Sequence, residues 1–340
     1  MRKFTGFEYV QIAAANAYGM DKLEWDERLQ WFAQNEQELN KPVLDPDFLA
    51  KADKPHLLTK ALMAWKHYKN KIPSNIAVSL DATASGIQVL SVISGDRKAG
   101  ELVNIGSKTR RDIYTQLSSE DIPRKDLKQA ILTAFYGSTA MPQIVFGHKV
   151  GQFIELMATQ VRGPWQLKDF MLKLWNPNQT HHSWVMPDGF TVHIPSVVVE
   201  QKRVKLRMYQ ETGGIEYKNM TFKTSVIAPQ EKSRAMAANI THSIDAWVAR
   251  SVVWSAYQEG IRVAPIHDSF WALPNHMNRV RELYLKALVQ VDKSKVLESI
   301  DAQLKALTPG STAKTAAQLY QELGGQDMTE QIMASEYALS

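Results

Sequence analysis

The sequence predicts an α+β fold that is mostly helical and contains a small antiparallel sheet. Long stretches carry apolar residues every three or four positions, as in residues 25–39, and this spacing is typical of amphipathic helices. Cationic and apolar residues alternate over residues 203–208, which is typical of a strand. Short apolar segments also flank His267-Asp268-Ser269, a pattern that indicates a β-hairpin.

The remaining elements follow from the same patterns. We expect residues 6–70 to be mostly helical, apart from a proline-containing connector over residues 40–55. A strand over residues 76–80 then ends at Asp81, and helices are expected over 86–93, 109–117, 124–135 and most of 139–176. The chain from 184 to 224 is expected to be β, with Thr212-Gly213-Gly214 as the turn before a strand over 215–223. A helix over 230–258, strands over 262–266 and 270–273, and further helices complete the chain.

The composition excludes several kinds of chemistry. The absence of cysteine excludes disulfides, thiolate metal sites and a cysteine nucleophile. The net charge of +5 favours a polyanionic partner such as nucleic acid, although many basic proteins bind none. No apolar run approaches the ~18 residues of a membrane helix, and no apolar signal region follows Met1-Arg2-Lys3. We therefore expect a soluble intracellular protein with no membrane partner.

Two aspartates stand at positions suited to metal-dependent chemistry. Asp81 follows a short apolar strand and Asp268 lies at the tip of the expected hairpin. Two carboxylates of this kind can hold two divalent cations about 3.5–4 Å apart, and oxygen ligands suit Mg²⁺. Taken singly, each aspartate is more typical of a turn or a helix cap. The two lie far apart in the chain, so only the fold can bring them close together.

Basic residues form two further patterns. Arg124 and Lys128 lie four positions apart and therefore share a helix face, where two cations can bind a triphosphate. Tyr136-Gly137 follows at the end of this helix. Taken alone, this helix is more typical of a solvated basic face. Arg203, Lys205 and Arg207 point to one side of their strand, where they can follow DNA phosphates or simply form the polar face of a sheet.

Together these motifs resemble the single-subunit RNA polymerases of bacteriophages and mitochondria. The family's first catalytic motif, Asp-Gly-Ser-Cys-Ser-Gly-Ile-Gln, is similar to residues 81–88, which begin Asp81-Ala82. Its second motif is an Arg, a Lys four positions later and a Tyr-Gly, and its third is His-Asp-Ser-Phe, present here as residues 267–270. The three motifs occur in the family's order. Weaker similarities occur at 112–114, 184–190, 239–243 and 335–340, so the resemblance runs from about residue 6 to residue 340.

The resemblance implies a right-hand polymerase palm with fingers, and a role for each motif residue. Asp81 and Asp268, with the carbonyl of Ala82, would hold two Mg²⁺ ions. Arg124 and Lys128 would bind the triphosphate, and Lys128 would protonate the leaving pyrophosphate. Tyr136, with Gly137 after it, would monitor the ribose 2′-hydroxyl. His242 would contact the nucleotide, and His267 would position the hairpin or the primer end.

The resemblance also implies a domain organisation. Residues 1–104 would form N-terminal helices and the first part of the palm, 105–240 the fingers with a basic β-hairpin at about 190–225, and 241–340 the second part of the palm with C-terminal helices. Ala82 and Ala84 depart from the family's Gly and Cys, so Ala82 is expected to have ordinary dihedral angles. The family's promoter domain, thumb and Trp-Arg-Gly-Arg segment have no counterpart here.

We therefore expect the larger, catalytic subunit of a heterodimeric phage DNA-dependent RNA polymerase, with a shortened form of a longer chain as the alternative. A second subunit would supply the N-terminal and thumb parts. The other partners would be a DNA template, the RNA product, ribonucleoside triphosphates and a single-stranded-DNA-binding recruitment factor, all in the cytoplasm of the infected bacterial host.

Two other functions compete with this one. A family A DNA polymerase shares the palm, but its third motif usually has Glu where Ser269 stands here, and its first motif has a bulky Glu. A catalytically inactive nucleic-acid scaffold has no reason to retain Asp81, Arg124, Lys128 and Asp268 together.

Overall fold

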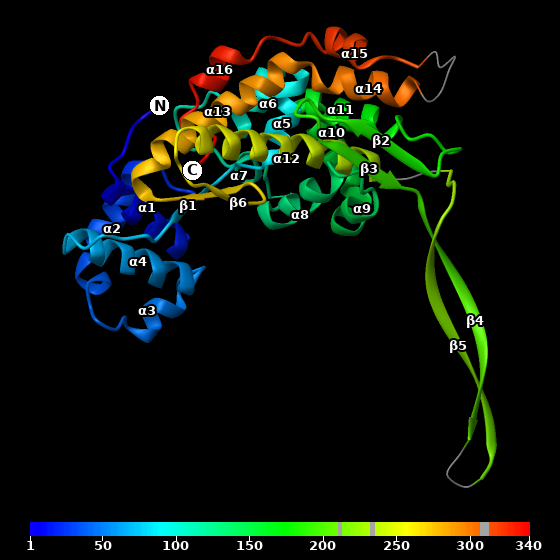
Figure 1. Cartoon of the computed structure of the whole chain (residues 1–340), viewed down its shortest axis with the longest axis horizontal. Coiled ribbons are helices and arrows are strands. Elements are labelled where there is room, and N and C mark those ends of the chain that lie inside the picture. The colour runs from blue at the N-terminus through cyan, green and yellow to red at the C-terminus, as the bar shows by residue number, and fades with distance from the viewer. Residues whose placement is uncertain (121, 210–212, 232–234, 307–312) are drawn as a thin grey trace.

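The computed structural model describes residues 1–120, 122–209, 213–231, 235–306 and 313–340. Within these residues the chain is mostly helical and carries small antiparallel sheets, as the sequence predicts. Figure 1 shows a central body of helices, with the N-terminal helices and a two-stranded ribbon projecting from the same side of it at opposite ends. No helix in the described part of the chain is long and apolar enough to cross a membrane.

The N-terminal part is helical, with α1 (Gly6–Ala15), the π-helix η1 (Asn16–Met20), α2 (Trp25–Leu39), α3 (Pro46–Ala50) and α4 (Pro55–Lys69). A capping box starts α1: the Thr5 hydroxyl accepts from the Glu8 N–H, and the Glu8 carboxylate accepts from the Thr5 N–H. Trp25 and Trp65 are fully buried where these helices pack. The expected connector over 40–55 contains α3, because Asp45 caps this short helix and Pro46 occupies its first turn.

A three-stranded sheet lies at the centre, with strand order β1-β7-β6. Strands β1 (Val78–Asp81) and β6 (Ala264–Ile266) both pair antiparallel with β7 (Ser269–Ala272). The hairpin expected around residues 267–268 is therefore confirmed, with slightly shorter strands. Helix α5 (Ser85–Ser94) follows β1 and packs against α12 (Ala235–Gln258) and α13 (Met277–Ser294), which fixes the loop after Asp81 against the body. The first residues of the helix expected from 230 fall partly on 232–234, outside the described residues.

A series of shorter helices follows, listed here in chain order: α6 (Arg97–Leu102), α7 (Ile113–Gln116), α8 (Arg124–Ala134), α9 (Ala140–Phe146), the 3₁₀ helix η2 (Gly147–Lys149), α10 (Val150–Gln160) and α11 (Arg162–Leu172). The expected helix over 109–117 is too long. The side chain of Asn104 hydrogen-bonds to both the N–H and the carbonyl of Arg111. These bonds hold the preceding backbone out of a helix, so α7 starts only at Ile113.

The expected β region forms two separate antiparallel pairs. Strands β2 (His181–Val185) and β3 (Thr191–Pro195) form one sheet, and β4 (Val197–Tyr209) and β5 (Ile215–Ile227) form the projecting ribbon. Strand β4 lies within the expected β region, whereas β5 extends beyond its expected end at residue 223 to Ile227. Thr212 of the expected turn lies outside the described residues, whereas Gly213 has the positive φ of 83° that favours glycine.

The C-terminal part returns to the central sheet through η3 (Pro274–His276), α13, α14 (Val296–Ala306), α15 (Ala316–Leu323) and α16 (Thr329–Met333). Leu339 forms an antiparallel bridge with Ala82, and the N–H of Ser340 donates to the carbonyl of Asp81 at 3.0 Å. The last residues of the chain therefore lie directly beside the strand that carries Asp81.

Candidate active site

The pairing of β1 with β7 brings the two predicted metal ligands together. Asp81 is paired in register with Ser269, and the N–H of Ala82 donates to the carbonyl of Asp268 at 3.0 Å. Burial raises the pKa of Asp268 above its ordinary value, and the negative charge of Asp81 raises it further. The two carboxylates are thus close enough to repel each other.

The turn that carries Asp268 has an unusual backbone. His267 has a φ of 55°, in the left-handed region that few residues with a side chain adopt. Such conformations cost energy and are concentrated at functional sites. The loop after Asp81 has a second one, because Ala84 has a φ of 51° at the start of α5. Ala82 has no positive φ, so the expectation of ordinary dihedral angles there is confirmed.

Oxygen ligands and excess negative charge at this point fit a hard divalent cation. A cation bound between Asp81 and Asp268 would relieve the repulsion that raises the pKa of Asp268. Among the described residues there is no cluster of three or more His, Asp or Glu that would form a complete metal cage. Mg²⁺ is usually held by only one or two carboxylates together with substrate phosphates, so the pair suits this ion.

Two charged neighbours of this pair were not identified from the sequence. Lys54, from the N-terminal part, has its Nζ 3.9 Å from Oδ2 of Asp81. Asp245, on α12, accepts a hydrogen bond from the hydroxyl of Ser85 at 3.3 Å. Burial and the charge of Asp268 raise the pKa of Asp245 to about 6. Asp245 lies three positions after His242, so the two residues share one face of α12. This spacing is the feature of the sequence from which Asp245 could have been predicted as a site residue.

Arg124 and Lys128 lie together on α8, as their spacing predicts. Nε of Arg124 donates to Oδ2 of Asp112 at 2.7 Å and to the hydroxyl of Thr115 at 3.0 Å. The Arg124 guanidinium carbon and the Lys128 ammonium each lie 5.9 Å from the centre of the Tyr114 ring. Burial raises the pKa of Tyr114 to about 12. Tyr114 therefore lies near both cations and lines a cavity with Asp268, although the sequence analysis assigned it no role.

A cavity of about 100 Å³ lies between the start of α5, the C-terminal end of α8 and the turn that carries Asp268. Its lining includes Ser85, Gly86, Tyr114, Tyr136, Thr241 and Asp268. The rings of Tyr136 and His242 lie 4.6 Å apart, and a Cβ at Gly86 would lie only 3.2 Å from the Tyr136 hydroxyl. Burial raises the pKa of Tyr136, whereas burial and the nearby His267 lower that of His242. Gly137 has a φ of 86°, which lets the chain turn directly after Tyr136.

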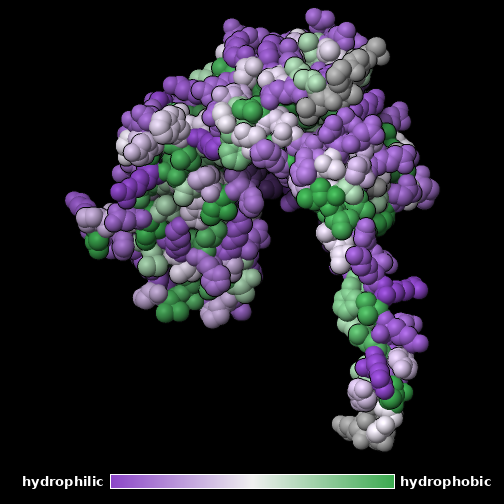
Figure 2. Space-filling model, turned by 45° about the vertical axis from the view of Figure 1, so that its right-hand side comes forward, coloured by the Kyte–Doolittle hydropathy of each residue, from purple (hydrophilic) through white to green (hydrophobic). Residues whose placement is uncertain are grey.

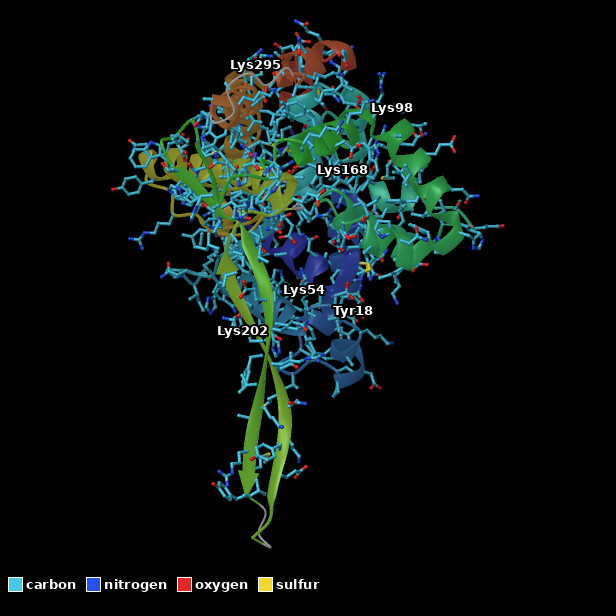
Figure 3. All side chains as sticks on the ribbon, turned by 90° about the vertical axis from the view of Figure 1, so that its right-hand side faces the viewer. Tyr18, Lys54, Lys98, Lys168, Lys202 and Lys295 are labelled. Atoms are coloured by element: carbon cyan, nitrogen blue, oxygen red, sulfur yellow. The ribbon has the colours of Figure 1, made fainter. Side chains whose placement is uncertain are left out.

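The structure therefore gathers most of the predicted site residues in one place. Asp268 and Tyr136 line one cavity together with the loop that follows Asp81, and His242 packs on Tyr136. Arg124 and Lys128 lie near the ring of Tyr114, which lines the same cavity. The basic residues Arg203, Lys205 and Arg207 lie elsewhere, on the projecting ribbon. Figure 1 shows the ribbon apart from β1, and Figure 3 labels Lys202 on the ribbon and Lys54 on the N-terminal part.

Comparison with known proteins defines the class to which this fold and site belong. The model of the DNA-dependent RNA polymerase family matches residues 3–120 and 144–337, so the chain belongs to this family. Helix α8, with Arg124 and Lys128, lies between the two matched segments.

Several relatives show the same similarity. The T7 RNA polymerase of Escherichia phage T7 is 23% identical over 82% of this chain and 42% of its own length. The DNA-directed RNA polymerase of Pseudomonas phage phiKMV is 20% identical over 81% of this chain and 41% of its own length. A Neurospora crassa protein named "Probable DNA-directed RNA polymerase" is 37% identical over 38% of this chain and 14% of its own length. The chain spans less than half the length of each of these relatives.

Proposed function

We propose that this chain is the catalytic part of a DNA-directed RNA polymerase. It would add ribonucleoside monophosphates to the 3′ end of an RNA on a DNA template and release pyrophosphate. The main support is the pairing of β1 with β7, which places Asp81 beside Asp268 in a chain that belongs to the polymerase family.

Asp81 and Asp268, with the carbonyl of Ala82, would hold two Mg²⁺ ions. These ions would lower the pKa of the attacking 3′-hydroxyl and balance the charge of the triphosphate. The protein's own contribution is to hold the two carboxylates rigidly: the N–H of Ala82 binds the Asp268 carbonyl, and the N–H of Ser340 binds the Asp81 carbonyl. Lys54 would compensate part of the negative charge of Asp81 before nucleotide arrives.

The two cations of α8 would bind the triphosphate. Asp112 and Thr115 hold the Nε edge of Arg124, which orients the guanidinium for the β- and γ-phosphates. Lys128, one helical turn further on, would lie at the α-phosphate and give its proton to the departing pyrophosphate. Catalysis would then depend mainly on positioning and on neutralising charge.

Tyr136 would distinguish ribose from deoxyribose in the incoming nucleotide. Its ring packs on His242, and its hydroxyl lies against Gly86 at the cavity that Asp268 also lines. A ribose in this cavity would bring its 2′-hydroxyl to Tyr136, while His242 contacts the nucleotide. The backbone of His267, with its positive φ, would fix the orientation of Asp268 relative to the 3′ end of the primer.

The domain assignment follows the same proposal. The three-stranded sheet, with residues 1–104 and 241–340, would form the palm, and residues 105–240 would form the fingers. The basic side of the ribbon, with Arg203, Lys205 and Arg207, would contact the DNA.

More than half of each phage relative's length lies outside the match with this chain. We propose that a second subunit supplies this part, including the thumb, and that the chain is the larger subunit of a heterodimeric phage enzyme in the cytoplasm of the infected host. A shortened form of a longer chain is the alternative. A single-stranded-DNA-binding factor would recruit the enzyme to its template.

Extension of an RNA primer annealed to a DNA template tests the activity directly. The chain is assayed with Mg²⁺, alone and with the polypeptide of the same genome that matches the upstream part of the phage relatives, using ribo- and deoxynucleotides in parallel. Asp268→Asn should abolish extension and weaken Mg²⁺ binding. Asp188→Asn is the matched control, because Asp188 also lies in a β-turn but pairs with Arg250.

Each result has a definite meaning. Extension with ribonucleotides only in the presence of the second polypeptide supports the split enzyme. Extension with deoxynucleotides alone would indicate a DNA polymerase instead. A folded chain that extends no primer under any of these conditions would indicate a nucleic-acid scaffold without catalytic activity.

A further inference from the structure

The central sheet has one buried face and one face that is open to further contacts. Leu80 pairs with Phe270 across β1 and β7, and these side chains are 2% and 1% exposed, so their face packs against the helical body. Side chains alternate between the two faces of a sheet, so Asp81, Ser79 and its partner Trp271 lie on the opposite face. The candidate metal ligand Asp81 therefore shares a face with Trp271.

A cavity of about 50 Å³ lies against this face. Its walls come from β1, from Trp271 of β7, and from the N-terminal part of the chain, including α1, η1 and α4. One water needs about 10–15 Å³ of such space, so the cavity has room for a group of a few non-hydrogen atoms. None of its described lining residues also lines the cavity that contains Tyr136. Figure 2 shows the molecule hollowed between the N-terminal part and the ribbon, with hydrophilic residues in the depth of the hollow.

Two hydrogen-bond donors at this cavity have no acceptor among the described residues. The indole N–H of Trp271 is buried and makes no hydrogen bond there. The ammonium of Lys60 lies 4.0 Å from the centre of the Trp271 ring, and burial lowers the pKa of Lys60 without an opposing effect from any described carboxylate. Buried donors are nearly always paired in folded proteins, so these two neighbouring donors indicate a ligand that supplies the acceptor.

The charges around the cavity favour an anion as this ligand. Lys54 and Lys60 both line it. Two acidic residues are among its described lining: Asp21 is paired with Lys22, and Asp81 would be neutralised by bound Mg²⁺. Two ammonium groups and an indole N–H match the oxygens of a phosphate group, which accept charge-assisted hydrogen bonds.

The position of the cavity indicates which phosphate would bind there. The proposed function gives the nucleotide triphosphate to Arg124 and Lys128, which lie near Tyr114 at the other cavity. A metal ion at Asp81 would activate the 3′-hydroxyl of the RNA, so the last nucleotide of this strand must reach Asp81. The phosphodiester that joins this nucleotide to the strand lies one sugar away from its 3′-hydroxyl. A phosphate site that also borders Asp81 suits this phosphodiester.

We propose that Lys60 and the indole N–H of Trp271, with Lys54 beside them, bind the phosphodiester next to the reacting 3′ end of the RNA. This inference rests on the proposed function for the identity of the strand. The site would hold the 3′ end against Asp81 without touching the bond that forms. Lys60 would supply positive charge, and Trp271 would supply a hydrogen bond of fixed direction because its backbone is part of the sheet. Free pyrophosphate is the other source of the same chemistry, and the experiment separates the two.

The indole N–H of Trp271 reports directly whether the site is occupied. The isotope-labelled chain, together with any polypeptide that primer extension requires, is observed by NMR with Mg²⁺ present and nucleotides absent, and Trp271→Phe assigns the resonance. It is titrated with an RNA primer on a DNA template, with the same duplex carrying a neutral methylphosphonate at the last primer linkage, and with pyrophosphate. The unaltered primer should shift the resonance downfield, as a new hydrogen bond does. The methylphosphonate should remove most of this shift, and pyrophosphate alone should cause none.

Lys60→Gln and Trp271→Phe should each weaken the binding of primer and template about tenfold, the value of one hydrogen bond to a charged group. Lys60→Gln should also lower the slope of log affinity against log salt concentration by about one, because one phosphate contact is lost. In the extension assay the loss should appear in the KM for primer and template and not in the KM for nucleotide. Lys60→Gln, at a partly exposed position of α4, keeps the test valid if Trp271→Phe disturbs the sheet.

The matched control is Lys69→Gln. Lys69 lies on the same helix, 4.7 Å from the centre of the Trp65 ring, but it pairs with Glu36 and does not line the cavity. This change should leave both the affinity for primer and template and the Trp271 resonance unaltered. Lys54 stays unchanged in the test because it also contacts Asp81.

Four results would overturn the inference: no shift of the Trp271 resonance with primer and template, a shift that survives the methylphosphonate, a shift caused by pyrophosphate alone, or equal affinities for Lys60→Gln and Lys69→Gln. The third would mean that the site holds free pyrophosphate and not the strand. Failure of the proposed function gives a different result. A chain whose Trp271 resonance responds to the last phosphodiester but that extends no primer would refute the proposed activity and leave this site standing.

Discussion

The hydroxyl of Ser85 lies between two carboxyl groups, those of Asp245 and Asp268. It donates to Oδ2 of Asp245 at 3.3 Å. Burial raises the pKa of Asp268, and a hydrogen bond with Ser85 offsets part of that rise. One hydroxyl has one proton, so it satisfies only one carboxylate at a time. The two carboxyl groups therefore share one donor. Burial, and after it the charge of Asp268, raises the pKa of Asp245 to about 6, and the hydrogen bond from Ser85 offsets only part of that rise.

This arrangement predicts that stability depends on pH through Asp245. The folded protein holds a proton on Asp245 up to about pH 6, whereas the unfolded chain releases it near the ordinary value of 3.8. The free energy of unfolding should therefore fall as pH rises through this window, by up to about 3 kcal/mol from this residue, and level off above it. Denaturation in EDTA between pH 4 and 7.5 measures this effect.

Asp245→Asn should remove most of that pH dependence, because Asn does not titrate. Asp169→Asn, a change at an exposed aspartate that pairs with Lys168, should leave it in place. Parallel pH profiles for the unaltered protein and Asp245→Asn would show that Asp245 ionises normally.

The parts of the site predicted from sequence are those fixed by local pattern. The hairpin around Asp268 follows from two short apolar segments and a turn, and Arg124 and Lys128 share a face because they lie one helical turn apart. Such features involve residues close in the chain, so periodicity and turn chemistry are enough to locate them.

The parts that the sequence did not reveal depend on long-range contacts. Lys54 reaches Asp81, and Ser85 reaches Asp245, only because separate elements pack together. The start of α7 likewise depends on the side chain of Asn104, which binds the backbone of Arg111. The prediction of a β region over 184–224 likewise did not show that it divides into two separate antiparallel pairs, because strand pairing depends on contacts between segments.

Lys128→Ala should lower the rate of nucleotide addition much more than the affinity for nucleotide. Lys128 is assigned to charge that develops as pyrophosphate leaves, and loss of one such group typically costs about 100-fold in rate. Single-turnover extension with varied nucleotide concentration separates the two effects. Lys125→Ala, an exposed lysine on the same helix, is the control. A loss of affinity with an unchanged maximal rate would remove the catalytic role of Lys128.

Tyr136→Phe should relax discrimination between ribo- and deoxynucleotides by up to about tenfold, the value of one hydrogen bond. The substitution keeps the ring against His242 and removes only the hydroxyl that lies beside Gly86. This discrimination is measured as the ratio of kcat/KM for ribonucleotides to kcat/KM for deoxynucleotides. Tyr257→Phe, at an exposed tyrosine on α12, should leave the ratio unchanged. If Tyr136→Phe also leaves it unchanged, another residue reads the sugar.

Arg281→Met should destabilise the fold by about 3 kcal/mol, because it leaves several buried acceptors without their donor. Arg281 is 1% exposed. Its two Nη atoms donate to the carbonyls of Arg2 and Glu336, at 2.8 and 2.7 Å, and to the Glu336 carboxylate at 3.0 Å. It therefore ties both ends of the chain to α13.

The control lies on the same helix. Arg279 is more exposed and pairs with Glu259 and Glu282, so Arg279→Met should cost less than about 1 kcal/mol. Chemical denaturation compares the two variants. Because Glu336 precedes the segment that ends at Ser340, beside Asp81, Arg281→Met should also make primer extension more sensitive to temperature. Equal losses of stability in both variants would show that the buried contacts of Arg281 contribute no more than a surface ion pair.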